Sequence, residues 1–178
     1  MLIRKFVVDN GKARRTALNW RTAATIFLSL TLAACGQAES GKTMTTTLES
    51  AKSKVTSLQQ EITVMVPEDL VISRFANDVS SLMRCDGEQK KWTGAAEIEL
   101  APGIDREVFL DKVRDSIAGR DGWKVSDDTD QDGGRRVDIL HDDGTHLLVS
   151  FYDSPETLRV AGFSACFDFP EYEYGEKY

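Results

Sequence analysis

The two histidines of this 178-residue sequence, His141 and His146, lie close together along the chain. Asp142, Asp143 and Gly144 follow the first of them, and Asp-Gly between alternating apolar residues is a hairpin signal. With Asp143 and Gly144 as a two-residue loop, the imidazoles would face each other about 5 Å apart at Cβ. They would then suit a shared metal ion, although zinc takes three or four protein ligands. The alternative interpretation is two polar residues beside a turn.

Three carboxylates alternate ahead of this hairpin, at Asp128, Asp130 and Asp132. With the glycine that follows, they resemble the opening of an EF-hand calcium loop, where alternating oxygens converge on a hard cation. The ninth position of that loop is Arg136 and the twelfth is Ile139, where the family has a bidentate glutamate. Two interpretations stay open: a weak calcium site of another kind, or an acidic hairpin loop that keeps an exposed sheet soluble.

A nucleophile is the third possible chemistry. Residues 162–166, Gly-Phe-Ser-Ala-Cys, begin like a nucleophile elbow but carry cysteine where the second glycine belongs. Cys166 with a histidine base would serve a thiol hydrolase only if Cys85 were free. The sequence contains no phosphate-binding Gly-rich loop and no metalloprotease motif. Catalysis is therefore the weaker hypothesis.

Two helices are predicted ahead of the first strand. Leu48, Val55 and Ile62 are seven residues apart and form an apolar stripe at helical spacing. This stripe predicts a helix that packs on its own domain or forms in part; a coiled coil is the alternative. Pro67 ends the stripe, and apolar residues at spacings near three and four predict a second helix over residues 68–83, which would place Cys85 just past its end.

The remaining chain predicts an α+β fold. Residues 92–100 alternate as a strand does, and residues 105–119 form a helix that Asp105 caps. Residues 122–167 contain about four strands joined by tight turns. A strand, a helix and a meander predict two layers, an antiparallel sheet packed by one or two helices. The aromatic and acidic tail over 168–178 is predicted to be frayed, or else to cover a sheet edge or contact a partner.

An apolar stretch near the start of the chain ends in Leu32-Ala33-Ala34-Cys35. Basic residues precede it, among them Lys12, Arg14, Arg15 and Arg21. Basic residues, a short apolar run and small residues indicate a secretory signal. A membrane span would need roughly 20 apolar residues.

Because the stretch ends on cysteine, it resembles the lipobox of bacterial lipoproteins, which signal peptidase II cleaves. The resemblance implies cleavage between Ala34 and Cys35, with a diacylglycerol on the Cys35 thiol and a further acyl group on the new amine. An ordinary secretory signal is the alternative, and the pair Arg14-Arg15 leaves Sec and twin-arginine export open.

Three segments follow from this interpretation. Residues 1–34 are the signal peptide, 35–62 a lipidated tether with a possible amphipathic helix, and 63–178 a single domain. The chain is also similar to small, uncharacterised actinobacterial lipoproteins of the LppA kind. The residues that carry this similarity are Cys85, Trp92-Thr93-Gly94, Pro102-Gly103, Gly122-Trp123 and Cys166.

With Cys35 assigned to lipid, Cys85 and Cys166 remain. A pair of cysteines in an exported chain predicts a disulfide, and two reduced buried thiols are the alternative.

The net charge of the mature chain argues against two classes of binding partner. Residues 1–34 contain six of the 22 Lys and Arg and one of the 29 Asp and Glu, so the mature chain has a formal charge near −12. A surface this acidic argues against nucleic acid and against adsorption to anionic headgroups.

We therefore expect a monomer at the extracytoplasmic face of the cell membrane, held by lipid and without another cofactor. Its domain would be non-enzymatic and would bind an envelope protein, a peptide or a small ligand. The alternatives are an envelope hydrolase and a metal-binding lipoprotein.

Cys35→Ala removes the thiol that would carry the lipid. Because the mature chain is acidic, we expect the variant to leave the membrane fraction and appear in the medium without losing its fold. Cell fractionation with circular dichroism of the released protein measures both effects. Retention of the variant in the membrane fraction would contradict the anchor.

Overall fold

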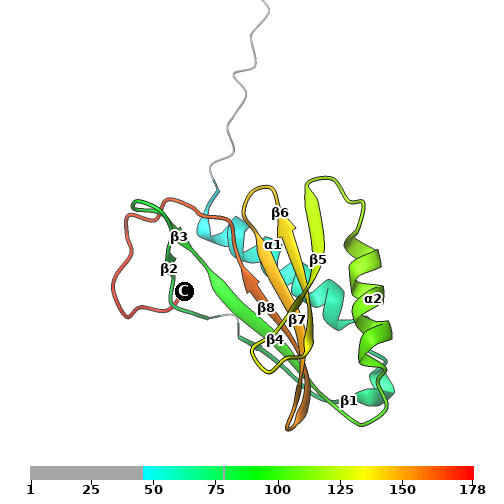
Figure 1. Ribbon diagram of the computed structural model, residues 1–178. Coiled ribbons are helices and arrows are strands. Elements are labelled where there is room, and N and C mark those ends of the chain that lie inside the picture. Colours follow the sequence, from blue (N-terminus) through cyan, green and yellow to red (C-terminus); the bar gives the residue numbers. More distant parts are fainter. Residues whose placement is uncertain (1–45, 78) are drawn as a thin grey trace, which may run out of the picture. The chain divides into compact units, whose positions relative to one another are not determined.

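The computed structural model describes residues 46–77 and 79–178. The predicted signal peptide over residues 1–34, Cys35 and the first part of the predicted tether, up to residue 45, lie outside these ranges. The elements in chain order (Figure 1) are α1 (Leu48–Thr63), the 3-10 turn η1 (Glu68–Leu70), β1 (Val71–Asn77), β2 (Met83–Arg84), β3 (Lys90–Lys91), β4 (Thr93–Leu100), α2 (Arg106–Ile117), β5 (Trp123–Thr129), β6 (Arg135–His141), β7 (His146–Asp153) and β8 (Glu156–Phe163). None of the helices in the described part is long and apolar enough to cross a membrane.

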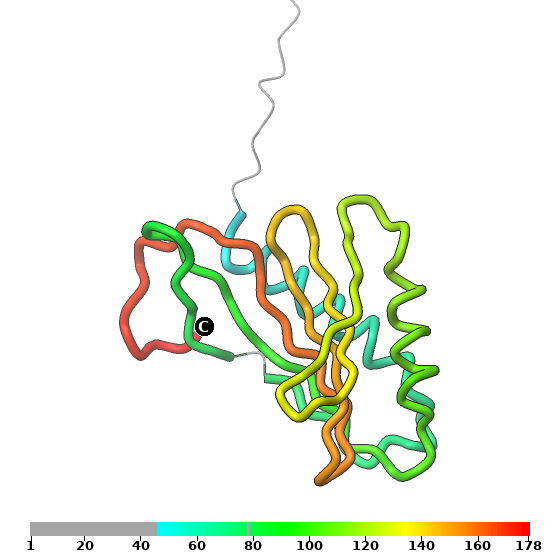
Figure 2. Tube along the Cα trace, in the orientation of Figure 1, coloured from blue at the N-terminus to red at the C-terminus, as the bar shows by residue number. Residues whose placement is uncertain are grey.

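Six strands form one antiparallel sheet in the order β1-β4-β8-β7-β6-β5, and β2 pairs with β3 in a separate small hairpin. Strands β5 to β8 follow one another through tight turns, as the tube in Figure 2 shows, and form the predicted meander. Strand β4 joins the far side of β8, and β1 adds to β4 as an edge strand. The predicted α+β class is confirmed.

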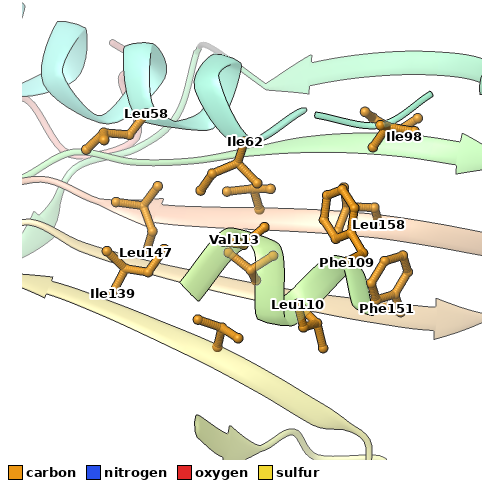
Figure 3. Packing of buried hydrophobic residues seen from close by; sticks show 14 of the residues in the cluster. Leu58, Ile62, Ile98, Phe109, Leu110, Val113, Ile139, Leu147, Phe151 and Leu158 are labelled. Atoms are coloured by element: carbon orange, nitrogen blue, oxygen red, sulfur yellow. The ribbon is translucent and has the colours of Figure 1, made fainter. Parts of the chain in front are cut away.

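Both helices cover the same face of the sheet. Leu58 and Ile62 of α1 and Phe109 and Val113 of α2 belong to one buried core (Figure 3). The strands contribute every second residue to this core, because side chains alternate between the two faces of a sheet. These residues include Ile98, Val137, Ile139, Leu147, Val149, Leu158 and Val160. Asp105 caps α2 as predicted, since its side chain accepts a hydrogen bond from the backbone N–H of Val108.

Helix α1 approaches β8 closely at Gly162. A Cβ atom there would lie 2.2 Å from Cγ1 of Val55. Across the strand register, Gly162 faces Gly94 of β4, where a Cβ would lie 2.1 Å from the Trp92 ring. Two facing glycines therefore make the space that α1 and Trp92 occupy.

The predicted helix over residues 68–83 is wrong. Residues 71–77 of this segment form strand β1, whose β-branched and aromatic residues favour a strand. The apolar spacing that indicated a helix does not mark a buried face, because Ile72 and Phe75 are 59% and 61% exposed.

The folded domain begins before the predicted boundary at residue 63. Helix α1 buries Ala51 and Val55 in a second cluster with Trp92, and its C-terminal half enters the main core. The prediction of a helix that packs on its own domain is thus confirmed. The stripe is too short for a coiled coil of its own and is covered by the sheet instead.

The prediction of a frayed tail is also wrong. Phe169, Tyr172 and Tyr178 pack against the second cluster, where large aromatic side chains bury much apolar surface. Tyr178 exchanges two backbone hydrogen bonds with Ser80, and Trp92 Nε1 donates to the Tyr178 carbonyl oxygen at 3.2 Å. The tail therefore closes over Trp92.

Gly162→Ala tests the close approach of α1 to the sheet. Because the new methyl group would overlap Val55, we expect the free energy of unfolding to fall by about 1–3 kcal/mol, the usual cost of overpacking a core. Urea titrations of the single and double variants measure it. Val55→Ala should recover part of the loss, so that the double variant is more stable than the sum of the single effects allows. Additive losses would contradict the contact.

Candidate functional site

The histidines do not face each other as predicted. The turn between β6 and β7 has three residues, because the His141 N–H donates to the Thr145 carbonyl at 2.8 Å and the Gly144 N–H donates to that of His141 at 2.9 Å. His146 therefore pairs with Leu140. A register shift of one residue moves a side chain to the other face of the sheet, so the two imidazoles project in opposite directions. The predicted pair of facing histidines is wrong.

His141 belongs instead to an ion-pair cluster between α1 and this turn. Lys54 Nζ lies 2.7 Å from Asp143 Oδ2 and 2.9 Å from His141 Nδ1. The ring of Trp123 lies 4.6 Å from that of His141, centroid to centroid, and 5.1 Å from Lys54 Nζ. Burial alone would raise the pKa of Asp143, but hydrogen bonds from Lys54, Thr145 and His141 outweigh it and hold that pKa well below its usual range.

Two of the three carboxylates of the acidic loop, those of Asp128 and Asp130, have partners within the protein. Asp130 accepts hydrogen bonds from the backbone N–H groups of Asp132 and Gly134, at 3.0 and 2.8 Å. Asp128 forms an ion pair of 2.7 Å with Arg136, the residue that departs from the calcium-loop pattern. Across residues 46–77 and 79–178, no set of three or more His, Cys, Asp or Glu is arranged to hold a metal ion. The loop has the geometry of a closed turn between β5 and β6.

Cys85 and Cys166 form the predicted disulfide. It joins the turn between β2 and β3 to the segment that follows β8. Next to the disulfide, Lys90 and Phe167 exchange two backbone hydrogen bonds. Ser164 is 1% exposed, and its hydroxyl donates to the Ala165 carbonyl. A bonded sulfur supplies no thiolate and this hydroxyl is buried, so neither of the predicted nucleophiles is available for attack.

A groove of about 380 Å³ lies between α1 and the edge strand β1. Its volume is within the range of small-ligand sites. The helix contributes four residues at i, i+3, i+4 and i+7 spacing, which share one helical face. Strand β4 lies beneath. The lining residues are Thr56, Gln59, Gln60, Thr63, Arg74, Phe75, Ala76, Asn77, Ala96, Glu97 and Ile98.

Gln59 is the most buried polar residue that lines this groove, at 4% exposure. Its Nε2 donates to the carbonyl oxygens of Gly94 and Val160, at 3.1 and 2.9 Å, and so both of its donor protons are used. The amide oxygen accepts no hydrogen bond from any described residue. Because this oxygen is open to solvent, a donor that enters the groove can bond to it in place of water.

Strand β1 has a neighbour, β4, on one side of the sheet order, and it forms that edge of the sheet. An edge strand presents unpaired N–H and C=O groups. At one end of the groove, the Arg74 guanidinium donates to the Thr63 carbonyl at 3.4 Å and pairs with Glu68 at 2.7 Å. Arg74 thereby links β1 to the end of α1 and to η1. Sequence reasoning missed this groove because it assigned β1 to a helix.

Comparison with known proteins gives little further help. No family model matches the chain, and no curated protein matches it. Among solved structures, the chain is similar to a DUF4853 family protein from Actinomyces odontolyticus ATCC 17982, with 14% identity, 72% of each chain covered and a TM-score of 0.46. A similarity at this level establishes neither family nor function.

Removal of the disulfide tests its structural role. The bond spans 81 residues of chain, and closing a loop of this length stabilises a fold by about 4 kcal/mol in the chain-entropy model. We expect the double variant Cys85→Ser/Cys166→Ser to lose most of that free energy of unfolding in a urea titration. The wild-type protein under reducing conditions should show a similar loss. Unchanged stability in both would contradict the role.

The Asp143 cluster predicts a dependence on pH. Because the pKa of Asp143 is lowered in the folded state, its contribution to stability is present above the unfolded-state pKa of about 3.9 and is lost as pH falls through the folded-state pKa. Lys54→Met should therefore cost up to about 1 kcal/mol at pH 5, and this difference from wild type should shrink below about pH 4. Urea titrations across this range measure it.

Lys52→Met is the matched control, since Lys52 lies on the same helix near the Trp92 ring and forms no ion pair with a described residue. The difference in free energy of unfolding between Lys52→Met and wild type should not change across this pH range. A Lys54→Met deficit that stays constant down to pH 2 would contradict the ion-pair explanation.

Proposed function

We propose that this chain is a lipoprotein held by lipid on Cys35 at the extracytoplasmic face of the cell membrane, and that its domain binds an extended peptide segment of an envelope protein. The binding site is the groove between α1 and β1. The Cys85–Cys166 disulfide supports the compartment, because such bonds persist in oxidising surroundings. The acidic mature chain supports attachment by lipid rather than by charge.

The observation that carries this proposal is a groove beside a sheet edge that pairs with no further strand of the described residues. A peptide that adds to such an edge forms backbone hydrogen bonds along its length, and every second side chain turns to one face. On β1, Ala76 lies on the face toward α1, since it pairs with the buried Ala96. Alternate side chains of an added strand would enter the groove at this face.

The lining of the groove favours binding over catalysis. Seven of its eleven residues are Thr, Gln, Asn or Ala, and the others are Arg74, Phe75, Glu97 and Ile98. No histidine, cysteine or serine is among them, and the carboxylate of Glu97 forms an ion pair of 3.5 Å with Arg159. The free oxygen of Gln59 gives the groove a preference for a ligand side chain with an N–H or O–H donor. Small polar side chains such as asparagine, serine and threonine meet both the volume and the chemistry of the groove.

Ala76→Trp tests the groove by filling it. A random linear peptide library displayed on phage is selected on the wild-type protein, and the enriched peptide is titrated against each variant. We expect Ala76→Trp to weaken its affinity at least tenfold, about 1.4 kcal/mol, because the indole would occupy the space between β1 and α1. Ser73→Trp is the matched control, since Ser73 pairs with Glu99 and projects from the other face of the same strand.

The control should bind the peptide with wild-type affinity, and both variants should keep the wild-type melting temperature. If no linear peptide is enriched, or if both variants bind the peptide equally well, the proposed site is wrong.

A further inference from the structure

Lys90 of β3 is a charged side chain that forms no ion pair within residues 46–77 and 79–178. It is 8% exposed, and its Nζ forms no ion pair or hydrogen bond with any other described residue. Its nearest specific contact is the ring of Tyr172, whose centroid lies 4.8 Å from Nζ. Lys90 as a whole is largely buried, and a single cation–π contact replaces little of the hydration that such a side chain loses.

The surroundings of Lys90 form a second cavity, separate from the α1–β1 groove. The cavity has a volume of about 490 Å³ and is lined by Glu88, Lys90, Asp168, Phe169, Pro170 and Tyr172. Phe169 and Tyr172 also pack against the cluster around Trp92, which fixes one wall. The other wall is the β2–β3 hairpin, which the disulfide and the backbone pair between Lys90 and Phe167 hold in place.

The residues that line this cavity favour one class of ligand. The ammonium requires an anionic group, and the two rings with Pro170 offer an apolar surface for a flat or cyclic body. Glu88 and Asp168 lie at the same cavity and disfavour further negative charge. Asp168 also accepts a hydrogen bond from Gln89 at 3.1 Å, which keeps its carboxylate beside the opening.

We propose that this cavity is a binding site for a small organic monocarboxylate with an aromatic or alicyclic body, whose carboxylate pairs with Lys90. Lys90, a largely buried lysine that lines the cavity, is then its anion-binding group. Because the cavity shares no residue with the α1–β1 groove, this site is independent of the peptide-binding function proposed above.

Benzoate and inorganic phosphate are the two probes, each titrated into the full chain in mild detergent and followed by NMR shifts of the Tyr172 and Phe169 rings. We expect benzoate to saturate these shifts and phosphate to leave them unchanged, because the acidic side chains repel a dianion. Lys90→Met should weaken benzoate binding at least tenfold.

Lys91→Met is the matched control. Lys91 is the next residue of the same strand, and its Nζ lies 5.8 Å from the Phe163 ring, outside the cavity. This variant should bind benzoate as wild type does.

Stability separates a binding role from a structural one. Methionine has nearly the length of the lysine stem and carries no charge, so the melting temperature of Lys90→Met should equal or exceed that of wild type. Tyr172→Leu removes the ring that faces the ammonium and should also weaken benzoate binding, which keeps the test decisive if Lys90→Met folds poorly. Absence of benzoate shifts in the wild-type protein, or binding that survives both Lys90→Met and Tyr172→Leu, would overturn the proposal.

Discussion

The packing of α1 against the sheet is the contact on which the rest of this domain depends. Gly94 and Gly162 face each other across β4 and β8, and together they leave room for Trp92 and for Val55 of the helix. Gln59 then donates to backbone carbonyls of both strands. Because α1 contributes buried residues to both apolar clusters, it joins the main core to the region around Trp92. Its remaining face is one wall of the groove, so the same helix stabilises the fold and shapes the proposed site.

The two proposed sites differ in how their walls are held. The α1–β1 groove is made of regular elements, a helix and a sheet edge, and its polar group is a neutral amide. The Lys90 cavity is made of a short hairpin and an irregular tail, which cannot hold each other through a long ladder of backbone hydrogen bonds. The disulfide and the aromatic packing of Phe169 and Tyr172 supply the missing restraint. Lys90 is therefore positioned by covalent and aromatic contacts near the Cys85–Cys166 bond.

Much of the fold follows from local patterns, and the parts that do not are those set by register and tertiary contact. The cap of α2 at Asp105, the alternation along β4 and the two remaining cysteines each carry their signal in the sequence, and each prediction is confirmed. Strand β1 was misassigned because the spacing of its apolar residues resembles a helix, while most of its side chains lie at an exposed edge. The prediction of facing histidines is wrong because the turn has three residues instead of two. Local sequence does not determine the length of this turn. The groove and the free oxygen of Gln59 arise only when α1 meets strands far away in the chain, so no motif marks them.

The central claim is that a partner segment adds to β1 beside α1. The most direct measurement is isotope-edited NMR of the full chain with a peptide selected from a linear library, read as nuclear Overhauser contacts between the two molecules. If a peptide adds to β1, we expect contacts from its backbone to Arg74, Phe75 and Ala76, together with contacts to the side-chain amide of Gln59. Contacts confined to the opposite face of the sheet, around His146 and Arg159, would contradict it.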